Sequence, residues 1–228
     1  MVVEGFHALK HAIRFGARLR EVACSDAGTL EALAGDLAPD VTETLEEAAT
    51  VVGPDVFSRL APRPHPTGVV AVADRPSPGR ALERRRGRVV VLERPRRPNN
   101  VGASVRVAAA AGAAGVVVVD GADPWHPEAV RTGAGLQFAL DVTLVPAFPP
   151  TPLTVVAMDP DGDPTLDVPA DAAICFGTER EGLSAALRDR ADRVVALPMR
   201  SGVSSLNLAT AVAATLYRRP GAMPPAPD

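Results

Sequence analysis

Small polar side chains gather in one stretch near the end of the chain, residues 197–211, which read LPMRSGVSSLNLATA. A short apolar run, residues 194–197, leads into it. Ser and Asn oxygens accept hydrogen bonds from the free N–H groups of a helix's first turn, so this stretch predicts a strand, a loop and a capped helix. In α/β proteins the same arrangement presents backbone donors to a ligand. A capped C-terminal helix without any ligand is the alternative.

Two other loops carry polar residues directly after apolar runs. Residues 93–106 read ERPRRPNNVGASVR, where Asn99 and Asn100 are predicted to cap the following helix and Arg106 can share the face that the loop presents. Residues 176–184 read FGTEREGLS, in which two glycines bracket a short polar segment. The sequence thus places candidate chemistry in three loops that each follow a strand.

Several common reaction classes lack their motifs in this sequence. A dinucleotide site needs Gly-x-Gly-x-x-Gly between a strand and a helix, and the nearest approach, Gly112 to Gly115, precedes a strand instead. There is no phosphate-binding Gly-x-x-x-x-Gly-Lys-Ser/Thr loop, no Gly-x-Ser-x-Gly elbow and no histidine beyond His126. Cys24 and Cys175 match no metal-ligand spacing. Redox, phosphoryl-transfer, hydrolytic and metal chemistry are therefore disfavoured, and no metal is expected.

The segment that holds the three loops contains six short apolar runs. They lack the alternation of a half-exposed strand, which favours a parallel sheet covered on both faces. The predicted strands are residues 89–92, 116–119, 140–145, 155–158, 173–176 and 194–197, and the best helices are residues 100–111 and 204–217.

An earlier series of elements predicts a second, smaller α/β unit. Helices are expected at residues 4–15, 30–37 and 46–52, and strands at residues 21–24, 41–45 and 68–73. Residues 74–88 read DRPSPGRALERRRGR, a composition typical of a linker. We therefore expect α/β domains at 1–74 and 88–219, a linker at 75–87 and a disordered tail at 220–228.

Charge is unevenly distributed along the 228 residues, whose net charge is −3. Residues 75–106 hold ten arginines against Glu83 and Glu93, whereas the segments on either side are acidic. A basic block in an acidic chain indicates contact with a polyanion. A solvated Arg-rich linker is the alternative, because the chain has 23 arginines and one lysine. Without a long apolar run or a secretory signal, the protein is expected in the cytoplasm.

The three loops together resemble the signature motifs of the SpoU/TrmH branch of the SPOUT RNA methyltransferases. The matching segments are PNNVGASVR at 98–106, FGTEREGLS at 176–184 and LPMRSGVSSLNLATA at 197–211. Through EGFHALKHA and HPTGVVAVA, the first unit is similar to the family's small substrate-binding domain, which has a ribosomal L30e-like fold. The resemblance covers nearly the whole chain and implies a mostly parallel α/β domain with a deep trefoil knot.

The resemblance also implies an activity, the transfer of a methyl group from S-adenosyl-L-methionine to a ribose 2′-hydroxyl of RNA by a homodimer. The positions that match the family's cofactor contacts are Gly177, Gly182, Leu197, Met199 and Leu206. The positions that match its reacting centre are Asn100, Arg106, Glu179, Ser205 and Asn207. Contacts with rRNA or tRNA, between which the sequence does not choose, are expected at Arg84, Arg85, Arg86, Arg96, Arg97 and Arg131. A catalytically inactive RNA-binding protein of the same fold is the alternative function.

The roles of two residues stay open at this point. The 2′-hydroxyl must be deprotonated or polarised as it attacks, and the resemblance to the family implies that Arg106 performs this step. A guanidinium normally stays protonated, so stabilisation of the developing oxyanion is preferred here over general-base action. Glu179 belongs either to the reacting centre or to an ion pair with Arg106 or Arg180.

The chain departs from the family pattern at three places. Arg97 stands where relatives often carry an acidic residue, and Gly133 stands where many have Ser. Between residues 145 and 154 only PAFPPTPL intervenes, where relatives usually have a helix. The sheet edge at this shortened crossover is therefore expected to be irregular.

Overall fold

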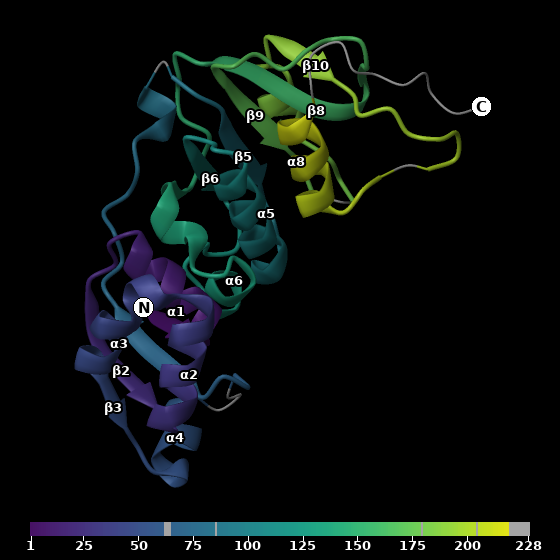
Figure 1. The fold of residues 1–228 in the computed structure, drawn as a ribbon. Coiled ribbons are helices and arrows are strands. Elements are labelled where there is room, and N and C mark those ends of the chain that lie inside the picture. The colour runs from purple at the N-terminus through teal and green to yellow at the C-terminus, as the bar shows by residue number, and fades with distance from the viewer. Residues whose placement is uncertain (62–64, 85, 179, 204, 219–228) are drawn as a thin grey trace.

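The computed structural model describes residues 1–61, 65–84, 86–178, 180–203 and 205–218. These residues form two sheets, which lie toward opposite ends of the molecule (Figure 1). The four-stranded sheet comes from the first third of the chain, and the six-stranded sheet from the remainder. None of the helices formed by the described residues is long and apolar enough to cross a membrane. The predicted tail at 220–228 lies outside the described residues.

The smaller sheet has the strand order β1-β4-β2-β3. Strands β1 (Val2–Glu4), β4 (Val69–Ala73) and β2 (Leu19–Cys24) pair antiparallel, and β3 (Ala49–Val51) joins β2 in parallel. Its helices are α1 (Phe6–Arg14), α2 (Ala27–Leu37), the short 3₁₀ helix η1 (Pro39–Val41), α3 (Thr42–Ala48) and α4 (Pro54–Leu60). Apolar side chains from the sheet and helices bury one core, which includes Val3, Phe6, Leu9, Leu30, Leu45 and Val69.

Two predictions in this half are wrong. A strand is predicted at residues 41–45 and a helix at residues 46–52, but α3 covers Thr42–Ala48 and β3 covers Ala49–Val51. The helical segment TETLEEA is rich in the helix formers Leu, Glu and Ala, and it buries Leu45. The following ATV contains two β-branched residues, which suit a strand. The local propensities therefore agree with the structure, and it is the predicted boundary that is misplaced.

The larger sheet is parallel throughout, with the order β10-β8-β9-β5-β6-β7. Its strands are β5 (Val89–Glu93), β6 (Gly115–Val119), β7 (Asp141–Val145), β8 (Thr154–Asp163), β9 (Ala172–Phe176) and β10 (Arg193–Val195). The accompanying helices are η2 (Ala81–Glu83), α5 (Pro98–Ala110), α6 (Pro127–Thr132), η3 (Leu136–Ala139), α7 (Ala185–Arg188) and α8 (Leu208–Tyr217). All six predicted strands are confirmed, and the register shifts between β10 and β8, at Val194 and Val195.

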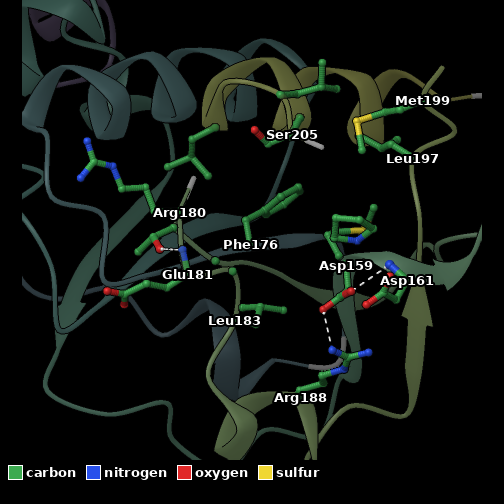
Figure 2. A pocket seen from close by; sticks show the side chains of 18 residues that line it. Asp159, Asp161, Phe176, Arg180, Glu181, Leu183, Arg188, Leu197, Met199 and Ser205 are labelled. Atoms are coloured by element: carbon green, nitrogen blue, oxygen red, sulfur yellow. Dashed lines mark hydrogen bonds and ion pairs between the residues drawn. The ribbon is translucent and has the colours of Figure 1, made fainter. Parts of the chain in front are cut away.

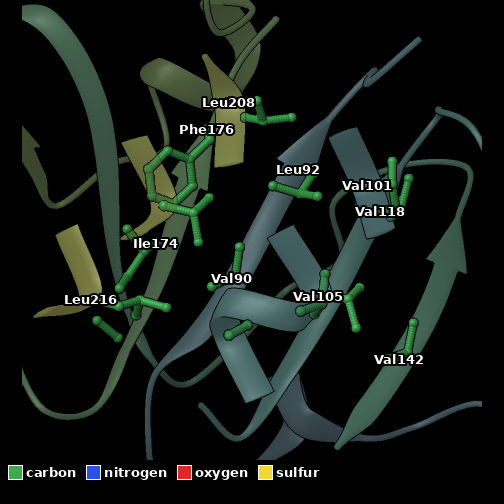
Figure 3. Close-up of a cluster of buried hydrophobic side chains, with 14 of the residues drawn as sticks. Val90, Leu92, Val101, Val105, Val118, Val142, Ile174, Phe176, Leu208 and Leu216 are labelled. Atoms are coloured by element: carbon green, nitrogen blue, oxygen red, sulfur yellow. The ribbon is translucent and has the colours of Figure 1, made fainter. Parts of the chain in front are cut away.

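Alternate residues of the central strand β5 face two separate cores. Val90 and Leu92 pack beneath α5 and α8, in the cluster that Figure 3 shows. Val89 and Val91 face the other side, where Phe148 and Leu153 of the crossover between β7 and β8 cover the sheet. The structure places no helix in this crossover at residues 146–153, as the sequence predicts. The Arg190 guanidinium fixes the segment, because it donates to the Phe148 and Pro149 carbonyls at 2.6 and 2.9 Å.

Helix α1 joins the two halves of the chain. Its His11 Nδ1 donates to the carbonyl of Ala134, 2.7 Å away, in the turn that follows α6. A Cβ added at Gly135 would lie 2.1 Å from the carbonyl oxygen of Ala8, so the turn and the helix touch backbone to backbone. Val130 of α6 also packs into the smaller core. The small half is thus attached to the turn that follows α6.

Candidate active site

A pocket of about 400 Å³ opens where residues 158–161 of β8 and the carboxyl end of β9 face the segment that precedes α8 (Figure 2). This volume lies in the range of small-molecule sites. Ligands of parallel α/β sheets bind outside the carboxyl ends of the strands, so the location is the expected one. The lining is apolar at Phe176, Leu183, Leu197, Met199, Leu206 and Leu208, and charged at Asp159, Asp161, Arg180, Glu181 and Arg188.

The predicted cofactor residues all line this pocket. Gly177 and Gly182 come from the loop after β9, and Leu197, Met199 and Leu206 come from the segment before α8. The predicted reacting-centre residue Ser205 lines it as well. Glu179, another predicted residue of that centre, lies outside the described residues. The structure therefore brings two loops together that are separate in the sequence.

The loop after β9 is a tight turn that glycine makes possible. Thr178 and Gly182 exchange backbone hydrogen bonds of 3.1 and 3.0 Å. A Cβ at Gly177 would lie 2.0 Å from the carbonyl carbon of Gly182, and Gly182 itself has a φ of 65°. Gly177 has no room for a side chain, and Gly182 has a backbone conformation that ordinary residues rarely adopt, so the backbone itself forms this rim of the pocket.

Asn207 connects the third loop to the first. Its Oδ1 caps α8 by accepting from the N–H groups of Ala209 and Thr210, at 3.0 and 3.4 Å, which confirms the predicted capped helix. Its Nδ2 lies 3.3 Å from Oδ1 of Asn100, so two predicted residues of the reacting centre are in contact. The caps predicted for the helix of the first motif, Asn99 and Asn100, are wrong. That helix is α5, which has Arg97 as its N-cap residue and Pro98 in its first turn.

Arg106 stands apart from the pocket. It is exposed on α5, is not among the lining residues, and lies close enough to His7 of α1 to affect its charge. Partial burial lowers the pKa of His7, and the positive charges of Lys10, His65 and Arg106 lower it further. The structure thus places Arg106 with other basic groups beside the smaller half, not in the pocket with Ser205.

The predicted RNA-contacting arginines do not form one patch. Arg84 and Arg86 precede the first residue of β5, whereas Arg96 and Arg97 follow its last residue, and all four are exposed. A five-residue strand spans roughly 16 Å, so the two pairs lie at opposite edges of the sheet. Arg84 is 3.7 Å from Asp141, and Arg131 points to the smaller half, 3.3 Å from Glu4. Arg85 lies outside the described residues.

None of the described charged residues that line the pocket is among the site residues predicted from the sequence, and neither is Glu93. Asp159 and Arg188 line the pocket and form an ion pair at 3.1 Å, and Glu93 is buried at the end of β5. Asp159 and Glu93 could have been found, since each directly follows a predicted apolar strand. Arg188 could not, because its role depends on where α7 lies. Within the described residues, no group of three or more His, Cys, Asp or Glu side chains could hold a metal ion.

Residues 87–217 match the model of the SpoU rRNA Methylase family. The chain belongs to this family. A 23S rRNA (uridine(2479)-2′-O)-methyltransferase from Streptomyces viridochromogenes is 32% identical over 199 residues, which cover 79% of this chain and 69% of that protein. The 23S rRNA (guanosine(2553)-2′-O)-methyltransferase RlmP of Bacillus subtilis is 26% identical, covering 96% of this chain and 88% of that protein.

Solved structures of the SpoU family have the same fold. The SpoU methyltransferase AviRb from Streptomyces viridochromogenes superposes with a TM-score of 0.78, at 29% identity, covering 95% of this chain and 87% of that one. A second structure of AviRb, in complex with the cofactor AdoMet, gives a TM-score of 0.76 at 27% identity, with 95% and 88% coverage. The likeness thus extends beyond the part matched by the SpoU model to the smaller half of the chain.

Proposed function

We propose that this SpoU-family chain transfers a methyl group from S-adenosylmethionine to a ribose 2′-hydroxyl of ribosomal RNA. One observation carries the proposal: the pocket is bounded by the two motif loops at 177–182 and 197–206, and the contact between Asn100 and Asn207 adds the first motif beside it. The two relatives described above are named as 23S rRNA 2′-O-methyltransferases, which favours rRNA over tRNA as the substrate.

The residues present fit S-adenosylmethionine. Phe176, Leu197 and Leu208 offer an apolar surface to a purine ring, while Asp159 and Arg188 offer both charges to a zwitterionic amino-acid group. Gly177 and Gly182 line the pocket and have no side chain of their own, so backbone groups form this part of its wall. When bound, S-adenosylmethionine supplies an electrophilic methyl group on a sulfonium. The sulfur leaves as part of a neutral thioether, so no acid is needed to protonate the leaving group.

The protein's part in the reaction is to orient the hydroxyl and stabilise its charge. Asn100 and Asn207 fix each other's side chains, so both amides are held in a defined orientation beside the pocket. Ser205 lines the pocket from the same segment and can hydrogen-bond to the hydroxyl. The exposed Arg106 binds the adjacent RNA phosphate, and it stabilises the oxyanion if the RNA or a second subunit brings the 2′-oxygen to it.

We further propose the assembly that the family resemblance implies. Residues 1–74 form an L30e-like RNA-binding domain, 75–87 a linker and 88–219 the methyltransferase domain with a deep trefoil knot. A homodimer, in the cytoplasm, completes the active site. The position of Arg106 supports a dimer, since this residue lies outside the pocket of its own chain. Size-exclusion chromatography with light scattering tests the dimer, and a monomer at micromolar concentration would contradict it.

Transfer of tritium from labelled S-adenosylmethionine tests the activity. Ribosomal RNA and tRNA are offered separately, and nuclease digestion then identifies the labelled nucleotide. We expect a 2′-O-methylated nucleotide in the rRNA pool and no transfer by Arg106→Ala. Label in tRNA alone would contradict the rRNA assignment. If the wild type binds RNA but transfers no label to either pool, including precursor rRNA, the inactive RNA-binding alternative is correct.

A further inference from the structure

Glu93 ends β5 with a carboxylate that is almost enclosed. The residue is 8% exposed, and both of its oxygens accept hydrogen bonds from a single residue. The Ser184 backbone N–H donates to Oε2 at 2.7 Å, and the Ser184 hydroxyl donates to Oε1 at 2.6 Å. Hydrogen bonds to a carboxylate are stronger than neutral ones, and a buried charge is tolerated where such bonds compensate it. Glu93 therefore fixes Ser184 at a defined place beside β5.

Ser184 is the point at which the loop after β9 becomes helix α7. Its hydroxyl oxygen accepts from the N–H of Leu187 at 3.2 Å and so caps the helix. Gly182 and Leu183, directly before it, line the pocket, and so does Arg188 at the end of α7. The ion pair between Arg188 and Asp159 then reaches β8, one residue beyond the part of that strand that pairs with β9. The position of Ser184 thus determines pocket residues on both sides of it.

Arg94 makes a second connection to the same rim. Its guanidinium lies 3.8 Å from the carboxylate of Glu181, another lining residue. The backbone of Arg94 has a φ of 49°, and its N–H donates to the Val119 carbonyl at 2.7 Å. A non-glycine residue in this conformation is uncommon and is held by its surroundings. Two successive residues at the end of β5 are therefore directed at the pocket's rim.

We propose that Glu93 is a positioning residue for the cofactor: through Ser184 it holds the rim at residues 182–188 in the geometry that binds S-adenosylmethionine. The inference rests on the proposed function. The Ser184 N–H can only donate, so the residue at position 93 must present an acceptor to it. Gln supplies an acceptor for the N–H and a donor for the hydroxyl oxygen, whereas Ala leaves both groups of Ser184 without their partner.

Calorimetric titration of S-adenosylmethionine into the full chain tests this role. We expect Glu93→Ala to raise Kd about tenfold or more, because both charge-assisted hydrogen bonds that hold Ser184 are lost. Glu93→Gln is expected to stay within about threefold of the wild type. Glu83→Ala is the matched control, because this carboxylate is 68% exposed in η2 and precedes the opposite end of β5. Its Kd is expected to equal that of the wild type.

The number of binding sites per chain, which calorimetry also measures, distinguishes a positioning role of Glu93 from a role in folding alone. A residue that only supports folding reduces the number of sites but leaves the affinity of the folded fraction unchanged, whereas a positioning residue raises Kd at constant stoichiometry. A wild-type Kd in Glu93→Ala overturns the inference, with or without loss of sites. Should that variant not fold, Ser184→Ala removes the hydroxyl bond to Glu93 together with the cap bond from the Leu187 N–H, while the backbone N–H bond to Glu93 stays. An unchanged Kd there overturns the inference as well. A wild type that binds no S-adenosylmethionine overturns the proposed function together with the inference.

Discussion

The side-chain nitrogen of Asn207 lies 3.3 Å from the side-chain oxygen of Asn100, although 107 residues separate them. The oxygen of the same Asn207 side chain accepts the N–H groups of Ala209 and Thr210 at the start of α8. One amide thus serves two segments, with its acceptor on the helix and its donor on the first motif. Because the two contacts use different atoms, a substitution can remove one and keep the other.

Asn207→Asp is expected to separate stability from activity. Asp caps helices as well as Asn does, so the melting temperature should stay close to that of the wild type. Its carboxylate repels Oδ1 of Asn100 instead of donating to it, so methyl transfer should fall about tenfold or more. Asn207→Ala should lose activity and also about 1 kcal/mol of cap stability. Thermal melting and tritium transfer measure the two effects, and a fully active Asn207→Asp would show that the contact with Asn100 does not serve the reaction.

The two arginine pairs beside β5 are expected to contribute unequally to RNA binding. Arg96 and Arg97 lie at the carboxyl edge, near the motif loops, whereas Arg84 and Arg86 lie at the other edge. Replacing the first pair with Ala should reduce the slope of log affinity against log salt by about 0.7 to 0.9 for each RNA phosphate that is no longer neutralised. The second pair, replaced in the same way, is the control and should change the slope less. Filter binding of an rRNA fragment over a salt series measures both, and equal effects would mean that the RNA reaches both edges.

Acidification is expected to weaken the attachment of α1. Burial lowers the pKa of His11 from its ordinary value of 6.5, and the hydrogen bond to Ala134 only partly opposes this effect. As pH falls, His11 is therefore protonated in the unfolded chain before it is protonated in the folded protein. The stability that neutral His11 contributes is complete above pH 6.5 and is lost as pH falls through the lower pKa of the folded state. The pKa of His7 is lowered too and adds an effect of the same sign.

Melting temperatures on either side of this window test the sign. The wild type should melt lower at about pH 5.5 than at about pH 7.5. His11→Gln keeps a donor for the Ala134 carbonyl but does not titrate, so the melting temperature of this variant should fall less on acidification. If the melting temperature of His11→Gln falls as much as that of the wild type, other groups cause the pH dependence.

Two glycines with nearly equal, positive φ angles should lose different amounts of stability when they are replaced by Ala. Gly135 and Gly112 have φ values of 72° and 70°. Nothing lies within 4 Å of a Cβ at Gly112, whereas a Cβ at Gly135 meets the Ala8 carbonyl at 2.1 Å. Gly112→Ala should therefore cost only the conformational term of about 1 to 2 kcal/mol, and Gly135→Ala should cost more. Urea unfolding measures both, and equal losses would mean that α1 can move away from the turn at little cost.

The strands and the capped final helix could be predicted because each depends on a local pattern. Buried parallel strands are continuous apolar runs, and residues 89–92 and 173–176 show this clearly. The Asn207 cap follows from residue type and position. The N-cap of α5 could have been predicted correctly as well. Pro favours the first turn of a helix, so Pro98 leaves Arg97, not Asn99, as the cap.

Relations between distant segments could not be predicted in this way. The Arg-rich stretch looks continuous in sequence, but β5 runs through it and carries its ends to opposite edges of the sheet. The acceptor role of Glu93 depends on Ser184, which is 91 residues away. Arg106 shares a motif with Asn100, yet it is not among the residues that line the pocket and lies near enough to α1 for its charge to lower the pKa of His7. These outcomes depend on packing and not on local propensity.

The close fit between α1 and the turn after α6 has a consequence for protein engineering. Exchanging the first 74 residues for those of a relative would replace Ala8 and His11 but leave Ala134 and Gly135 behind. Glu4 would likewise be separated from Arg131. A chimera should therefore transplant the turn at residues 130–135 along with its matching helix, and the unit of exchange is then discontinuous in the gene.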